Sequence, residues 1–129
     1  ELCHYARVKF KKLIISTGMS TETEITKVIT KCNPDIIMHT NSTYPCPFKE
    51  LNLNYIRWLM SKYPKKEIGY SGHEEGIIST LSTIPLGVNW IERHVTLDKS
   101  MWGSDQKASI NPVEMYQLVN GVKELQQAY

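Results

Sequence analysis

The stretch EIGYSGHEEGIISTLSTIPLGVNWIERHV, residues 67–95, decides the fold class of this chain. It begins and ends with short runs rich in branched and aromatic apolar residues, 67–73 and 89–95, which predict β-strands. Between these runs, residues 74–84 repeat apolar side chains at helical spacing. A strand, a helix and a second strand make a parallel unit, because parallel neighbours need a crossover of helix length. The stretch therefore predicts two parallel, neighbouring strands.

The same alternation extends in both directions along the chain. KLIIST at 12–17 and DIIMHTN at 35–41 predict two further strands. The remaining helices are expected in three segments, at 20–32, at 50–63 and at 111–129. Two of them carry start signals: a capping box of Thr21 and Glu24, and Asn111 as N-cap followed by Pro112 and Glu114. Four parallel βα units in series place the chain in the α/β class.

Two architectures fit four parallel βα units: half of a TIM-type (β/α) barrel, or a small open doubly wound sheet. A complete barrel of eight units takes about 250 residues, and this chain has 129. The turn after the first strand, STGMST, lacks the GxGxxG fingerprint of dinucleotide-binding sheets. We therefore expect half a barrel, residues 1–129, as a single segment.

Polar residues stand at the carboxyl end of every predicted strand, where both architectures assemble their sites. In the last strand, Glu92 and His94 share a face, since side chains alternate along a strand. His73 ends the preceding strand. Two imidazoles and a carboxylate on neighbouring strands predict a divalent metal site for manganese, zinc or iron. The structural alternative is that each His is a satisfied, partly buried residue and that Glu92 pairs with Arg93 or a lysine.

Hydroxyl groups recur at the same strand ends. Ser16, Ser42 and Ser71 each precede a helix, an arrangement that binds phosphate through hydroxyl and helix N–H groups, although serine is also a good helix cap. The long polar loop 98–109 offers Asp105 for a hydroxyl-bearing ligand, and Tyr44 lies in a Pro-rich loop close to a strand end. A turn aspartate and a rigid connector are the alternatives for these two.

The bulk properties exclude several classes of protein. The formal net charge is +2 with no basic stripe, which argues against a nucleic-acid partner. No apolar run reaches the roughly 20 residues of a membrane span. Three cysteines without CxxC spacing suit a reducing compartment, so we expect a cytoplasmic protein. The opening ELCHYARVKF has no initiating Met and resembles the end of a helix already under way, which suggests a piece of a longer protein.

Several blocks, in order and with preserved spacing, resemble the sialic acid synthase family, which includes N-acetylneuraminate, legionaminic acid and pseudaminic acid synthases. They are IISTGMST, MHTNSTYPCPFKELNL, IGYSGHEEGI and IERHVTLDKSMWGSDQKAS, and they extend over essentially the whole chain. The resemblance implies the second half of a (β/α)8 barrel, without the family's antifreeze-like domain. The implied reaction condenses phosphoenolpyruvate with an N-acetylated aminosugar such as N-acetylmannosamine, giving a nine-carbon 2-keto acid and phosphate.

The resemblance also implies a role for each candidate residue. His73 and His94 match the two ligands of a divalent metal, usually manganese, with magnesium or cobalt as alternatives, and Glu92 matches the acid beside them. Ser16, Ser42 and Ser71 match contacts to phosphoenolpyruvate, and Tyr44 and Asp105 match contacts to the sugar. Some relatives have Asn at the position of Ser42, and many have Asp at that of Gly72. The family implies a homodimer as the full-length enzyme.

Three function classes follow: an enzyme segment, a non-catalytic half-barrel interaction module, and another metal-dependent aldolase or hydrolase. A non-catalytic scaffold has no need for a polar strand face, so the polar residues favour the enzyme segment. Since the family draws a lysine and further acids from the first barrel half and an arginine from the following domain, we expect the isolated chain to have little synthase activity. Its open sheet edges predict self-association.

Overall fold

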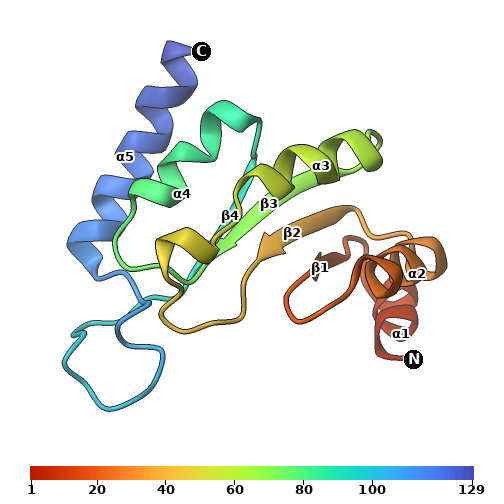
Figure 1. Ribbon diagram of the computed structural model, residues 1–129, viewed down its shortest axis with the longest axis horizontal. Coiled ribbons are helices and arrows are strands. Elements are labelled where there is room, and N and C mark those ends of the chain that lie inside the picture. The colour runs from red at the N-terminus through yellow and green to blue at the C-terminus, as the bar shows by residue number, and fades with distance from the viewer.

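The computed structural model describes residues 1–129 and contains one four-stranded parallel sheet in the order β1-β2-β3-β4. The strands are β1 (Ile14–Ser16), β2 (Ile36–Thr40), β3 (Glu67–Gly72) and β4 (Trp90–Arg93), and each lies inside one predicted run. The helices are α1 (Leu2–Lys9), α2 (Glu22–Cys32), α3 (Asn54–Lys62), α4 (Ile78–Ser82) and α5 (Pro112–Ala128), with short 3-10 turns at Phe48–Glu50 and Ile84–Leu86. Figure 1 shows α1 and α5 at opposite edges of the sheet. The α/β class and the partial (β/α) barrel are confirmed, since four such units are half of an eight-unit barrel.

The predicted capping box at Thr21 is present, and the predicted N-cap Asn111 also forms one. The Thr21 backbone N–H donates to Glu24 Oε2 (2.8 Å), and the Glu24 N–H donates back to Thr21 Oγ1 (3.3 Å). Asn111 and Glu114 make the same exchange at 2.9 Å in both directions. Each box satisfies backbone donors that a helix start leaves without partners, so α2 and α5 begin where the local sequence directs.

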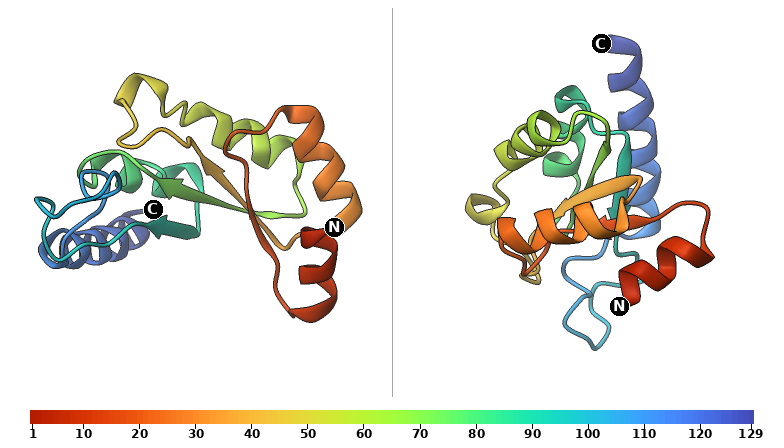
Figure 2. Two further views of the ribbon diagram at one scale, coloured as in Figure 1. Left: turned by 90° about the horizontal axis from the view of Figure 1, so that it is seen from below. Right: turned by 90° about the vertical axis from the view of Figure 1, so that its right-hand side faces the viewer.

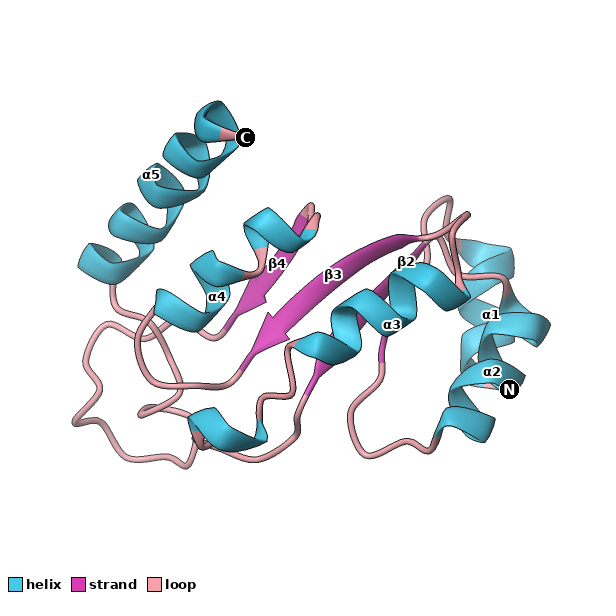
Figure 3. Cartoon of the chain, turned by 45° about the horizontal axis from the view of Figure 1, so that its top comes forward, coloured by secondary structure: helices cyan, strands magenta, loops and turns pink.

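The apolar core lies between one face of the sheet and the helices α2 and α3. Its buried members come from the two central strands, from these helices and from the turn before β4: Ile25, Ile29, Ile37, Ile56, Leu59, Ile68, Tyr70 and Val88. Figure 3 shows α3 lying along β3. Because side chains alternate along a strand, the other face belongs to the opposite set of residues, which include Ser16, Met38, Ser71 and Glu92.

That opposite face, which we call the inner face, is organised in rows by the strand register. One row joins Met38, Gly69 and Trp90, and the next joins Thr40, Ser71 and Glu92 toward the carboxyl ends. At the amino end, the Trp90 indole N–H donates to Glu67 Oε2 (2.5 Å) and the ammonium of Lys12 lies 4.6 Å from the centre of the Trp90 ring. Of the two rows, the one nearer the carboxyl ends, which carry the predicted site, is the more polar.

One predicted helix is much shorter than expected. The pattern at 74–84 predicts a helix throughout, but only Ile78–Ser82 forms α4. Gly76 adopts φ +77°, in the left-handed region, and this interrupts the helix near its expected start. Ile78, expected on the buried stripe, is 77% exposed.

The loop 98–109 has neither helix nor strand, as expected, and both Figure 1 and Figure 2 show it projecting beyond the carboxyl ends of the strands. The cysteines Cys3, Cys32 and Cys46 are all free thiols. None of the helices combines the length and the apolar character that crossing a bilayer demands.

Candidate functional site

Three aromatic rings meet at the carboxyl ends of the inner face. The ring centres of His73 and His94 are 5.1 Å apart in an edge-to-face arrangement. Tyr44 packs on both, with ring centres 4.1 Å from His73 and 5.5 Å from His94. The structure thus brings together three predicted site residues that follow three different strands, because parallel strands end at the same edge of a sheet.

The ring of His73 is held by its backbone surroundings. His73 is 5% exposed, and its Nδ1 lies 2.6 Å from the carbonyl oxygen of Asn41. A carbonyl oxygen only accepts, so this contact places the imidazole proton on Nδ1 and leaves a lone pair on Nε2. Neutral imidazole with Nδ1–H bonded to a carbonyl is the usual state of a metal-ligating histidine.

The ring of His94 has a carboxylate in the same position. Its Nδ1 lies 3.6 Å from Oδ2 of Asp105, which is predicted to contact the sugar. The loop that carries Asp105 returns to the sheet at Ile110, whose N–H donates to the His94 carbonyl (2.8 Å). The two histidines therefore share a pattern in which Nδ1 faces an acceptor of this chain and Nε2 makes no protein hydrogen bond.

Tyr44 brings a phenol group to the same place. Burial, followed by the nearby carboxylates of Asp105 and Glu92, raises the pKa of Tyr44 above its usual value. The phenol consequently stays protonated at neutral pH and can donate a hydrogen bond. Donation from a fixed phenol suits a hydroxyl or carbonyl oxygen of a ligand.

Glu92 lies on the inner face as predicted, but it bonds to serine rather than to a histidine. Its Oε1 accepts a hydrogen bond of 2.7 Å from Ser71 Oγ, between partners that are directly opposite on β4 and β3. No three side chains among His, Cys, Asp and Glu are placed to hold one metal ion. The structure thus supplies two imidazoles as a pair, with the Ser71–Glu92 pair on the row beneath.

The two remaining serines lie on the β1–β2 side. Ser16 is exposed at the end of β1 and makes no side-chain hydrogen bond. Ser42 lines a groove of about 710 Å³ between the loops that follow β1 and β2, together with Thr17, Thr40 and Asn41. The structure does not bring either serine into contact with the histidine pair.

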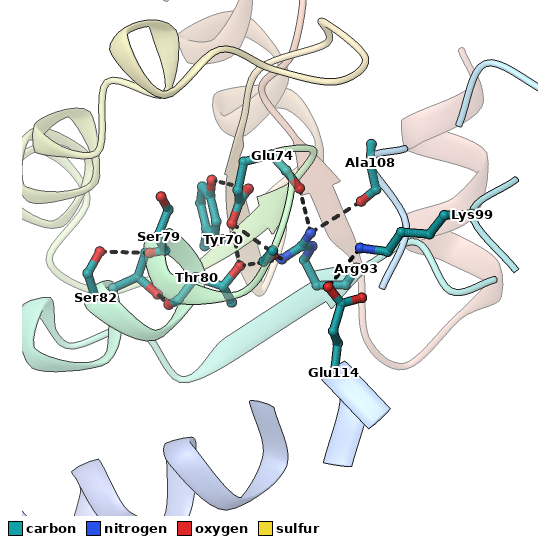
Figure 4. Close-up of polar contacts among 11 residues, drawn as sticks. Tyr70, Glu74, Ser79, Thr80, Ser82, Arg93, Lys99, Ala108 and Glu114 are labelled. Carbon is teal, nitrogen blue, oxygen red and sulfur yellow. Dashed lines mark hydrogen bonds and ion pairs between the residues drawn. The ribbon is translucent and has the colours of Figure 1, made fainter. Parts of the chain in front are cut away.

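A buried ion pair behind the histidines was not predicted. Glu74 opens the segment predicted as a helix, and Arg93 is the partner of Glu92 in the structural alternative. Instead Arg93 Nη1 lies 3.3 Å from Glu74 Oε1, with side chains 1% and 0% exposed, on the helix side of the sheet (Figure 4). Alternation of side chains could have predicted the side of the sheet on which this pair lies. If His73 and His94 point to the inner face, their neighbours Glu74 and Arg93 are expected to point away from it.

The pair is embedded in a network of hydrogen bonds. Glu74 accepts from the Tyr70 phenol (2.8 Å) and the Thr80 hydroxyl (2.6 Å). Arg93 donates to the carbonyl oxygens of Gly76 (2.8 Å), Glu74 (2.7 Å) and Ala108 (3.2 Å). Burial, followed by the Glu74 carboxylate, raises the pKa of Tyr70 far above its usual value, so its phenol remains a donor.

Comparison with known proteins places this geometry in a family. N,N'-diacetyllegionaminic acid synthase from Campylobacter jejuni is 38% identical over 125 residues, covering 92% of this chain and 37% of that protein. Human N-acetylneuraminate-9-phosphate synthase is 36% identical over 124 residues, covering 93% of this chain and 34% of that protein. The crystal structure of N-acetylneuraminic acid synthetase from Leptospira borgpetersenii, with citrate, superposes with a TM-score of 0.92 and 31% identity, covering 98% of this chain and 46% of that one.

The chain thus spans about a third of the length of these two sequence relatives. The model of the NeuB family matches it from residue 1 to residue 129. Because the match includes every strand and every predicted site residue, the chain belongs to the NeuB family.

Proposed function

We propose that the chain contributes to a synthase that condenses phosphoenolpyruvate with an N-acetylated aminosugar and releases phosphate and a nine-carbon 2-keto acid. The names of the relatives support the reaction class, since they are legionaminic acid and N-acetylneuraminate-9-phosphate synthases. The observation that carries the proposal is the histidine pair, 5.1 Å apart at the mouth of the half barrel with both Nδ1 atoms facing acceptors.

The donor set suits a divalent metal. Two imidazoles with Nε2 free can ligate a transition-metal ion such as manganese or cobalt when oxygen ligands complete the shell, while magnesium is bound by oxygen. His73 and His94 would hold the ion through Nε2, and further ligands would come from water, substrate or other parts of the protein. When bound, the ion would act as a Lewis acid toward the aldehyde of the open-chain sugar.

The other residues receive roles from their chemistry. Glu92 would accept a proton or orient the water that adds to the enol carbon, with Ser71 holding one of its oxygens. Tyr44 and Asp105 would contact the sugar, one as a phenol donor and the other as a carboxylate acceptor. Ser16, Ser42 and Ser71 would contact phosphoenolpyruvate. We further propose that the enzyme works as a cytoplasmic homodimer.

Manganese titration tests the site. Free Mn²⁺, followed by its electron paramagnetic resonance signal, should bind the parent chain, and His73→Ala and His94→Ala should each weaken binding at least tenfold. His4→Ala is the matched control, since His4 is exposed on α1. If both site variants bind Mn²⁺ as the parent does, the metal assignment is wrong.

A synthase assay tests the contribution of the chain. We expect the 129-residue chain to show little turnover with phosphoenolpyruvate and N-acetylmannosamine, because the chain offers two metal ligands and spans about a third of its relatives. Turnover near that of a full-length relative would contradict this expectation. Mn²⁺ binding without any turnover in a longer protein that contains this segment would favour the non-catalytic module.

A further inference from the structure

We propose that Arg93 is a positioning residue, whose buried guanidinium fixes His73, His94 and the Asp105 loop relative to one another from the opposite side of the sheet. The proposal rests on the proposed function in one respect, the role of the two histidines as metal ligands. The geometric part concerns this chain alone and can be tested without metal.

Chain connectivity makes the coupling direct. Arg93 is the last residue of β4 and immediately precedes His94, and Glu74 immediately follows His73 after β3. The ion pair contacts Tyr70 and Thr80 on the helix side of the sheet, whereas His73 and His94 contact Tyr44 at the inner face, so the two pairs lie back to back. A fixed Arg93–Glu74 contact therefore fixes the separation of the two histidine backbones.

The guanidinium also contacts the loop that carries Asp105. Arg93 Nη2 donates to the carbonyl of Ala108 (3.2 Å), three residues after Asp105. The Ser109 N–H and hydroxyl in turn donate to the Asp105 carbonyl at 3.0 and 2.8 Å. One side chain thus joins β4, the turn after β3 and the loop whose carboxylate faces His94.

Gly72 provides the space for this arrangement. A Cβ at Gly72 would lie 2.6 Å from Glu74 Oε2, 2.8 Å from Tyr70 Cε1 and 3.1 Å from Arg93 Cδ. Gly72 precedes His73 and is paired with Arg93 in the register of β3 and β4. The absence of a side chain at this position therefore lets the carboxylate and the guanidinium meet directly behind the histidines.

A positioning role differs from simple stabilisation in what it predicts. A buried ion pair replaced by apolar side chains often leaves stability unchanged or higher, whereas removal of one partner leaves a buried charge. If the pair only stabilised the fold, an apolar double replacement would keep the histidine geometry. If the guanidinium positions the loop and the strand ends, that replacement keeps the fold and loses the geometry, because no apolar group can donate to the carbonyls of Gly76, Glu74 and Ala108.

Nitrogen NMR of the imidazoles reads the geometry without metal. In ¹⁵N-labelled parent chain at pH 8, His73 should occupy the Nδ1–H tautomer and show ring-to-ring contacts with Tyr44. The double variant Arg93→Met with Glu74→Leu should keep the circular dichroism of the parent, yet show mixed His73 tautomers and weakened ring contacts. Arg93→Lys retains the charge but lacks the planar fork of donors, so its pattern should differ from that of the parent, though less than in the double variant, and it takes the place of the double variant if that fails to fold.

Controls and metal binding complete the experiment. Arg7→Met removes another multidentate arginine, paired with Asp35 at 2.6 Å near the amino ends of the strands, and should leave the tautomers unchanged. Mn²⁺ affinity should fall about tenfold or more in the double variant. Parent-like tautomers and ring contacts in the folded double variant, or in Arg93→Lys if that alone folds, would overturn the positioning role. A parent chain that shows the expected tautomer and binds no Mn²⁺ would instead refute the proposed function and leave the positioning role standing.

Discussion

Replacing Gly72 by alanine tests the packing behind the histidines most directly. The new methyl group would lie 2.6 Å from Glu74 Oε2, roughly 1 Å inside the optimal separation of about 3.5 Å for non-bonded atoms. Gly72 is not among the glycines with positive φ, so the backbone accepts alanine and the cost is steric. The carboxylate cannot retreat freely, because Tyr70 and Thr80 hold it from two sides.

The magnitude follows from these contacts. Overpacking a well-filled site costs about 1–3 kcal/mol, and we expect Gly72→Ala to lower the free energy of unfolding by this amount. Gly72→Asp adds a second carboxylate beside Glu74 and should cost about 3–5 kcal/mol, comparable with breaking a buried ion pair.

Urea unfolding followed by tryptophan fluorescence and circular dichroism measures both changes. Gly121→Ala on α5 is a suitable control. Its Cβ would meet only the flexible side chain of Leu81 on α4, at 2.8 Å, far from the histidines. A parent-like free energy of unfolding for Gly72→Ala, within about 0.5 kcal/mol, would show that Glu74 and Arg93 are not packed as described.

Two further predictions concern pH and helix capping. Burial lowers the pKa of His39 below 6.5, so the unfolded chain binds more protons and the free energy of unfolding should fall as the pH drops below about 6.5. His39→Phe should flatten this dependence, measured as urea midpoints from pH 7.5 to 5. At pH 7.5 the variant should also cost about 1–3 kcal/mol, because the Leu51 carbonyl loses its hydrogen-bond partner. An equally steep pH dependence in the variant would contradict the assignment. Asn111→Ala should cost about 1 kcal/mol through loss of the α5 cap, whereas exposed Gln117→Ala on the same helix should stay within about 0.5 kcal/mol, and equal losses would argue against a specific cap.

Local signals predicted most of the fold. The capping box at Thr21 and the N-cap Asn111 with Pro112 predicted two helix starts, because these signals join residues at most three apart. Branched apolar runs located all four strands, both the buried central strands β2 and β3 and the edge strands β1 and β4, which are half-buried or exposed. The prediction of a helix over 74–84 was largely wrong, because Gly76 adopts a left-handed conformation that the apolar spacing does not reveal.

The site was predicted less completely, and strand register explains the difference. The shared face of Glu92 and His94 follows from alternation within one strand, and it is confirmed. The partner of each polar residue, whether Glu92, Glu74 or Arg93, depends instead on which residues of β3 and β4 lie opposite each other. Alternation within β4 already argues against Arg93, the neighbour of Glu92, but only the register with β3 identifies Ser71 as the partner.

The back-to-back placement of Arg93 and His94 restricts how this segment can change length. Insertion or deletion of one residue within β4 would exchange the sides of the sheet to which Arg93 and His94 point. The guanidinium would then point to the inner face, and the imidazole would point into the apolar layer beneath the helices. A two-residue change preserves the sidedness of both. A single-residue change in β4 therefore needs a compensating β-bulge to keep both side chains on their sides of the sheet, whereas a two-residue change does not.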